Sequence, residues 1–225
     1  MTGFCQNVLK SKEKFMKKIL LAVLLSLAVA SGFAAGSKTY SSFGFHFSTP
    51  FMFEFGSANG EKNTGITNSV AFGINATNLY SEKIGIYAAL DIMLPLSITN
   101  YQTSNGKTES TTVTRDDYRA LWGMSCLMGP AIVVSKSEKN MFLISPGVHF
   151  NMLCAEAAAT LTSYTLGVGA NFQYNLFFGS NGYFNFGGDL AFDFLGWASL
   201  SGKNYSVNSV TVTVVPRIGV GFRYR

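Results

Sequence analysis

His46 and Ser48 are the first residues whose spacing could do chemistry, because two residues apart on a strand they share a face. An imidazole beside a hydroxyl group is the pairing that a nucleophilic hydrolase uses, with the histidine as general base. No acidic residue is obviously placed to orient the histidine, and both residues lie opposite the apolar face of Phe45 and Phe47. We therefore expect no catalytic residues and no enzyme.

A second set of residues could act through charge, because they interrupt apolar, glycine-rich stretches. Buried charges need partners. Counting along the strands proposed below places Asp189 opposite Arg217 and Asp91 opposite Arg119. We expect two ion pairs that plug or gate a narrow interior; the alternative is that the charges only satisfy one another in a filled interior. The ionisable residues expected to face inward are His46, Asp91, Arg119, His149, Asp189, Asp193, Arg217 and Arg223.

Positioning these side chains requires strands, and apolar residues indeed alternate with small or polar ones from Phe43 onward. The pattern predicts an all-β fold, an eight-stranded antiparallel up-and-down transmembrane β-barrel. An even number of strands lets the first and last pair, so that no edge faces lipid. The runs cover about 43–55, 66–74, 84–94, 118–132, 142–152, 164–176, 184–194 and 210–224.

The connections alternate in length, which is a second regularity. Those at 78–83, 135–140 and 177–182 are short, and those at 55–64, 95–117, 154–163 and 196–209 are mostly longer. This order is typical of outer-membrane barrels with short periplasmic turns and the amino terminus inside. The longest connection includes Tyr101 to Asp117, with Asn105 and Gly106 at its tip, and we expect it to contact a surface ligand; the alternative is a mobile solvated loop.

The face opposite the apolar one decides which side of the barrel meets lipid. It consists of Gly, Ser, Thr, Asn and Ala with few Lys or Glu, which suits a narrow interior better than a hydrated exterior. A secreted lipocalin-like ligand-binding barrel, with its apolar face inside, is the alternative. The many inward glycines put little volume inside the barrel, so a narrow channel for small solutes is a further alternative.

We expect residues 1–35 to be a signal peptide with its true start at Met16, because Lys17 and Lys18 precede an apolar stretch and then small residues. We expect cleavage after Ala34 or, as second choice, Ala30, so that residues 36–225 form the barrel. Without this leader the 17 basic and 12 acidic residues become 12 and 11, so the net charge falls from +5 to about +1. We therefore expect no nucleic-acid partner.

The two cysteines beyond the leader, Cys126 and Cys154, lie on neighbouring predicted strands, about five residues out of register. That offset is roughly 16 Å, too far for a disulfide, so we expect two free thiols that face lipid. The sequence has no phosphate-binding loop and no His/Cys metal spacing, so we expect neither a metal site nor a cofactor.

The leader, the eight runs and the terminal segment VTVVPRIGVGFRYR together resemble the small barrels of the outer-membrane protein A, X and W group, over roughly Tyr40 to Arg225. These proteins usually end in an aromatic residue that the barrel-assembly machinery reads, whereas this chain ends in Tyr224 and Arg225. The resemblance implies a bacterial outer-membrane protein, exported to the periplasm and in contact with outer-membrane lipid and lipopolysaccharide.

We expect a monomer that is a structural or surface-interaction protein or a narrow porin-like channel. A lipid-modifying barrel enzyme, of the lipid A deacylase or acyltransferase type, is an alternative because some barrels of this size have that activity. His46 and Ser48 would be its residues.

Overall fold

The computed structural model describes residues 40–58, 61–104, 107–201 and 203–224. The signal peptide predicted for residues 1–35 and the Asn105–Gly106 tip lie outside these ranges. Within them, no helix has the length and apolar character needed to cross a membrane.

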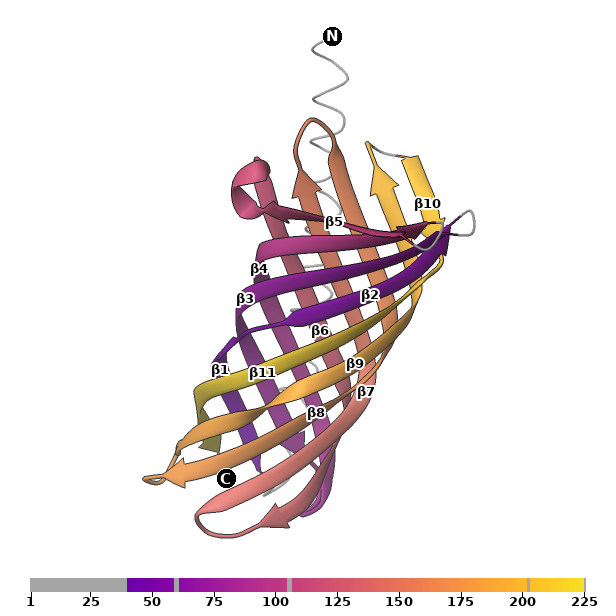
Figure 1. Cartoon of the computed structure of the whole chain (residues 1–225). Helices are drawn as coiled ribbons and strands as arrows, with labels where there is room; N and C mark the ends of the chain where they lie inside the picture. Colours follow the sequence, from indigo (N-terminus) through magenta and orange to yellow (C-terminus); the bar gives the residue numbers. More distant parts are fainter. Residues whose placement is uncertain (1–39, 59–60, 105–106, 202, 225) are drawn as a thin grey trace, which may run out of the picture.

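The described chain forms eleven strands that pair antiparallel and close into a tilted barrel (Figure 1). Eight positions make up the ring: β1 and β2 share one, and β3, β4, β6, β7, β8, β9 and β11 occupy the others. β5 pairs only with β4, and β10 only with β9. The strands are β1 (Ser41–Ser48), β2 (Phe51–Ala58), β3 (Glu61–Leu79), β4 (Ile84–Ser104), β5 (Lys107–Thr114), β6 (Ala120–Lys136), β7 (Asn140–Glu156), β8 (Thr160–Phe178), β9 (Gly182–Leu200), β10 (Lys203–Val207) and β11 (Ser209–Tyr224).

The first predicted run is one barrel position divided at Thr49 and Pro50. Proline has no N–H group to give to a ladder, so the strand is interrupted there. Its neighbours still hold it, because the Thr49 amide donates to the Pro216 carbonyl at 3.2 Å and the Ser69 amide donates to the Pro50 carbonyl at 3.0 Å. Both halves pair with β3 and β11, so the predicted barrel of eight positions is confirmed.

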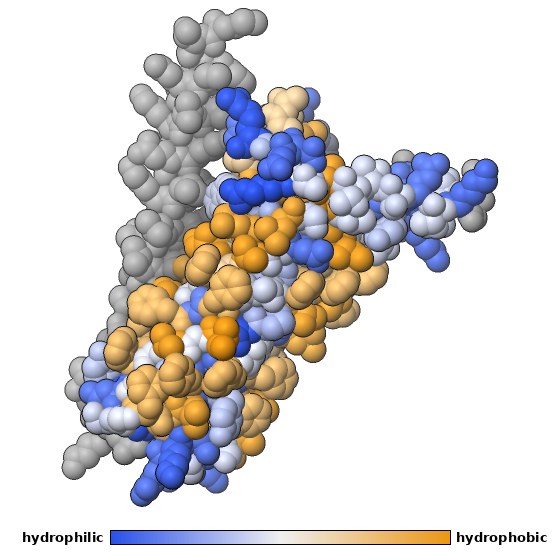
Figure 2. Space-filling model, turned by 60° about the vertical axis from the view of Figure 1, so that its left-hand side comes forward, coloured by the Kyte–Doolittle hydropathy of each residue, from blue (hydrophilic) through white to orange (hydrophobic). Residues whose placement is uncertain are grey.

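The apolar face of the strands points outward. Phe72 is 62% exposed, Val148 56% and Phe222 56%, although all three lie within regular strands. Figure 2 shows apolar residues covering the wall between more hydrophilic ends. A soluble lipocalin-like barrel would have the opposite arrangement, so that alternative is wrong, and the wall has the character of a surface solvated by lipid.

The two ends of the barrel differ, and we call them the short-turn end and the hairpin end. The short-turn end holds the connections 80–83, 137–139 and 179–181. At the hairpin end most of the residues predicted as long loops are instead antiparallel strands that continue beyond the ring. The predicted loop Tyr101 to Asp117 is the end of β4, β5 and the 3-10 turn η2 (Arg115–Asp117).

The interior is filled in layers. Nearest the short-turn end lies an apolar cluster of Tyr40, Leu79, Tyr87, Ala89, Leu127, Ala131, Met141 and Leu143, each at most 5% exposed. Charged and polar side chains form the next layer, and a small cluster of Met52, Ala71 and Met93 follows toward the hairpin end. The glycine-rich inner face therefore does not leave the short-turn half empty, because bulky residues such as Tyr87 and Leu143 occupy it.

Cys126 and Cys154 are both free, so the prediction of two unpaired thiols is confirmed. Cys126 lies opposite Phe150 and Cys154 opposite Trp122. The offset is therefore four residues, one fewer than predicted.

Candidate functional site

Arg217 on β11 is the centre of a buried charge cluster in the middle layer. Its guanidinium forms ion pairs with Asp91 on β4 and Asp189 on β9. It also donates to the Tyr87 hydroxyl at 2.9 Å, and Asn171 donates to Asp189 at 2.7 Å. One cation thus lies between two carboxylates that come from different sides of the ring.

His46 and Ser48 belong to the same cluster. Both contact Oδ1 of Asp91, the His46 Nε2 at 2.8 Å and the Ser48 Oγ at 2.9 Å. Sequence reasoning found no acid near this histidine, and the structure corrects this by bringing Asp91 from β4 across the intervening strand. The two residues are 4% and 1% exposed and face the interior, so membrane lipid does not reach them.

A second hydrogen-bonded chain crosses the same interior from β6 to β9. Ser125 Oγ and His149 Nε2 are 2.8 Å apart, and His149 Nδ1 and Asp193 Oδ1 are also 2.8 Å apart. Thr165 donates to the other Asp193 oxygen at 2.6 Å. Because an ionised carboxylate only accepts, Nδ1 carries a proton in this pair, and in a neutral imidazole Nε2 then accepts from Ser125.

This order of groups matches that of a Ser-His-Asp catalytic triad. A nucleophile must be reached by its substrate, however, and Ser125 and His149 are 2% and 0% exposed. These hydrogen bonds therefore give Ser125, His149 and Asp193 the partners that buried polar groups require in a filled barrel.

Both histidine–aspartate pairs reach across a strand at a glycine. Gly73 lies beside His46 on one side and Asp91 on the other, and Gly167 lies in the same way between His149 and Asp193. A Cβ atom at Gly73 would overlap the His46 imidazole, and one at Gly167 would overlap backbone of β9. Glycine is therefore required here so that residues two strands apart can meet.

Arg119 is the one predicted interior charge that the structure places elsewhere. It precedes β6, its side chain is exposed at the hairpin end, and the residue opposite Asp91 is Ser125. The prediction of an Asp91–Arg119 pair is wrong, and Arg217 is the partner of Asp91. Asp189 lies opposite Val215 rather than Arg217, but the long arginine side chain still reaches it.

Arg223 is buried but lies apart from the charge cluster, toward the short-turn end. Its Nε donates to the Ser180 carbonyl at 3.2 Å, and its guanidinium lies 3.8 Å from the Phe177 ring centre. The remaining predicted residues belong either to the Arg217 cluster or to the hydrogen-bonded series from Ser125 through His149 to Asp193.

Sequence reasoning missed the neutral members of these networks: Tyr87, Ser125, Thr165 and Asn171. All four lie on the inward side of their strands, and the alternation of the sequence correctly predicts that they face the interior. It could not separate them from the other small polar residues on the same face. In the ranges described, no group of three or more His, Cys, Asp or Glu side chains could hold a metal ion.

Comparison with known proteins supports the fold and not a particular function. No family model matches the sequence, and no curated protein matches it. Among solved structures, the outer membrane protein OprG from Pseudomonas aeruginosa aligns with a TM-score of 0.53 at 13% identity, over 83% of this chain and 95% of OprG. The attachment invasion locus protein Ail of Yersinia pestis aligns over 84% of this chain and 100% of its own, at 10% identity and a TM-score of 0.46.

The closed ring, its outward apolar wall and its buried charged interior define a small outer-membrane β-barrel. The structural likeness to OprG agrees with that class. The chain thus has the fold of a small outer-membrane barrel, with an outward apolar wall suited to membrane lipid.

Proposed function

We propose that this protein is a closed outer-membrane barrel that acts as a surface-interaction platform, without channel or catalytic activity. The observation that carries the proposal is the filled interior. An eight-stranded barrel is barely wider than its own side chains, and here apolar, charged and again apolar layers follow one another along it. The buried Ser125 and Ser48 supply no accessible nucleophile.

The hairpin end is the part that would meet partners. β4 and β5 extend there as a hairpin whose residues from Lys107 to Ser110 are all exposed. We assign this end to the cell exterior and the short turns to the periplasm, as the lengths of the connections favour. In the same proposal the leader directs export, the barrel-assembly machinery inserts a monomer, and lipopolysaccharide surrounds the outer half of the wall.

Planar-bilayer recording of the refolded protein tests whether the barrel is closed. We expect no steady conductance from the wild type, and an ion leak from a variant in which Tyr87, Leu127 and Leu143 are all changed to Ala. The substitution Ile84→Ala, on the outward face, is the matched control and should give no conductance. A steady conductance of the wild type equal to that of the widened variant would overturn the closed barrel.

Surface interaction is tested by shortening the β4–β5 hairpin. Replacement of residues 101–110 by a two-residue turn joins Asn100 to its partner Thr111 and leaves the ring pairings of β4 with β3 and β6 in place over residues 84–94. We expect cells with the shortened protein to lose adhesion to host cells or matrix, with barrel insertion unchanged. Equal adhesion of both strains would argue against this hairpin as the contact surface.

A further inference from the structure

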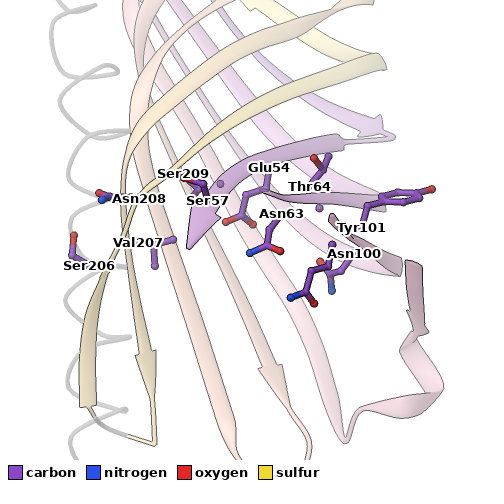
Figure 3. Close-up of a pocket in the computed structure, with 13 residues that line it drawn as sticks. Glu54, Ser57, Asn63, Thr64, Asn100, Tyr101, Ser206, Val207, Asn208 and Ser209 are labelled. Carbon is purple, nitrogen blue, oxygen red and sulfur yellow. The ribbon is translucent and has the colours of Figure 1, made fainter. Parts of the chain in front are cut away.

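A hollow of about 500 Å³ opens at the hairpin end, above the Met52 layer, between β2, β3 and β4 on one side and the β10–β11 connection on the other. Figure 3 shows Glu54, Asn63 and Asn100 leaving three adjacent strands on the same side, while Tyr101 and Thr64 point away. The volume lies within the usual range for small-molecule sites.

Gly65 lies on the floor of this hollow. Gly65 lies opposite Glu54 on β2 and opposite Asn100 on β4. A Cβ atom there would lie 3.4 Å from the Asn100 Oδ1 and 3.8 Å from the Glu54 Oε2, so both polar ends lie over the glycine. The arrangement repeats the histidine–glycine–aspartate rows deeper in the barrel, but here the flanking side chains do not bond to each other.

Several of the polar groups around the hollow have no hydrogen-bond partner in the described part of the chain. Within the described residues, the Glu54 carboxylate and the Asn63 and Asn100 amides have no side-chain hydrogen bond or ion pair. Ser209 also lines the hollow, and its buried Oγ has no hydrogen-bond partner. Four groups that can bind hydroxyls or ammonium therefore converge on one space, whereas the polar groups of the charge cluster below bind each other.

The negative charge in the hollow determines which class of ligand it favours. Glu54 is the one ionised side chain among the described residues that line it. Lys62, on the same hairpin, lies on the opposite face of β3 by the alternation of the strand. A carboxylate surrounded by amides and a hydroxyl favours a small molecule with one positive charge and several hydroxyl groups.

We propose that this hollow binds a small cationic, hydroxyl-rich ligand of the amino-sugar class, with Glu54 holding the ammonium group and Asn63, Asn100 and Ser209 the hydroxyls. The site deepens the proposed surface-interaction function, on which it rests for its outward orientation. It does not depend on whether the barrel conducts, so a conducting barrel would refute the closed-barrel proposal and leave this site standing.

Ligand-observed NMR on the full-length protein in lipid nanodiscs tests the site with four probes of similar size. Glucosamine carries charge and hydroxyls, glucose only hydroxyls, cyclohexylamine only charge, and glucuronate the wrong charge. We expect glucosamine to bind most tightly, about fivefold more tightly than glucose, which is the range of a solvent-exposed ion pair. Glucuronate should bind most weakly.

The variant Glu54→Gln should make glucosamine and glucose bind equally, and Ser209→Ala should weaken both sugars while leaving cyclohexylamine unchanged. Glu138→Gln removes the same charge at the opposite end of the barrel and should preserve the wild-type order. Heat-modifiable migration on a detergent gel checks that each variant is folded. The proposal is overturned if no probe binds, if cyclohexylamine equals glucosamine, or if the order survives in Glu54→Gln.

Discussion

Replacement of Arg217 by Met tests the central charge cluster. Methionine keeps a long unbranched side chain but removes the cation, so Asp91 and Asp189 lose their shared partner at sites that are 1% and 3% exposed. Breaking a buried ion pair by removing one partner costs about 3–5 kcal/mol, because the remaining charge is uncompensated. With two carboxylates left behind, we expect the unfolding free energy to fall by an amount at the upper end of that range.

Urea unfolding in lipid vesicles, followed through the fluorescence of the outward-facing Trp122 and Trp197, measures the loss. A triple variant that adds Asp91→Asn and Asp189→Asn to the Arg217 change should recover most of it, because neutral amides do not require a counter-charge. Arg119→Met is the matched control, since that side chain is exposed, and should change stability by less than about 0.5 kcal/mol. An Arg217 variant as stable as the control, or a triple variant no better than the single one, would refute the reasoning.

Three further outcomes are expected. Gly167→Ala should destabilise the barrel by more than about 3 kcal/mol or prevent folding, whereas Gly179→Ala, in a turn at φ 57° with open space around it, should cost about 1 kcal/mol in the same urea assay. Phe72→Arg should cost about 2–4 kcal/mol in vesicles, and Phe72→Leu less than about 1.5, because Phe72 faces lipid. Mass spectrometry of the unreduced protein should show Cys126 and Cys154 unlinked; a bridge between them would contradict the observed register.

The ring could be predicted because period-two alternation follows directly from strand geometry. The pairing of side chains across the interior could not be predicted from the sequence. Register shifts between Asn68 and Ser69 and between Leu166 and Gly167 change the alignment of neighbouring strands. The connection before Arg119 folds into its own hairpin, so counting across it misplaced that residue.

The candidate site was foreseen in its charged members and in Ser48. An ionised residue in an apolar run is conspicuous, which is why Asp91 and Arg217 were identified. Ser125 and Asn171 are ordinary small polar residues on an inward face and become significant only through their partners. Tyr87 was missed for a different reason: the inner face was expected to carry small residues, and a large aromatic fills it.

The position of Arg217 on the last strand has a consequence for assembly. Asp189 can meet Arg217 within the β9–β11 pair, whereas Asp91 on β4 gains this counter-charge only when β11 also pairs with β1, at the seam from Ser41↔Tyr224 to Ser48↔Arg217. A slip of one residue at that seam would turn the guanidinium toward lipid, and a slip of two would move it by about 6.6 Å along the wall. Closure of the barrel in the correct register is therefore what completes the neutralisation of its interior charges.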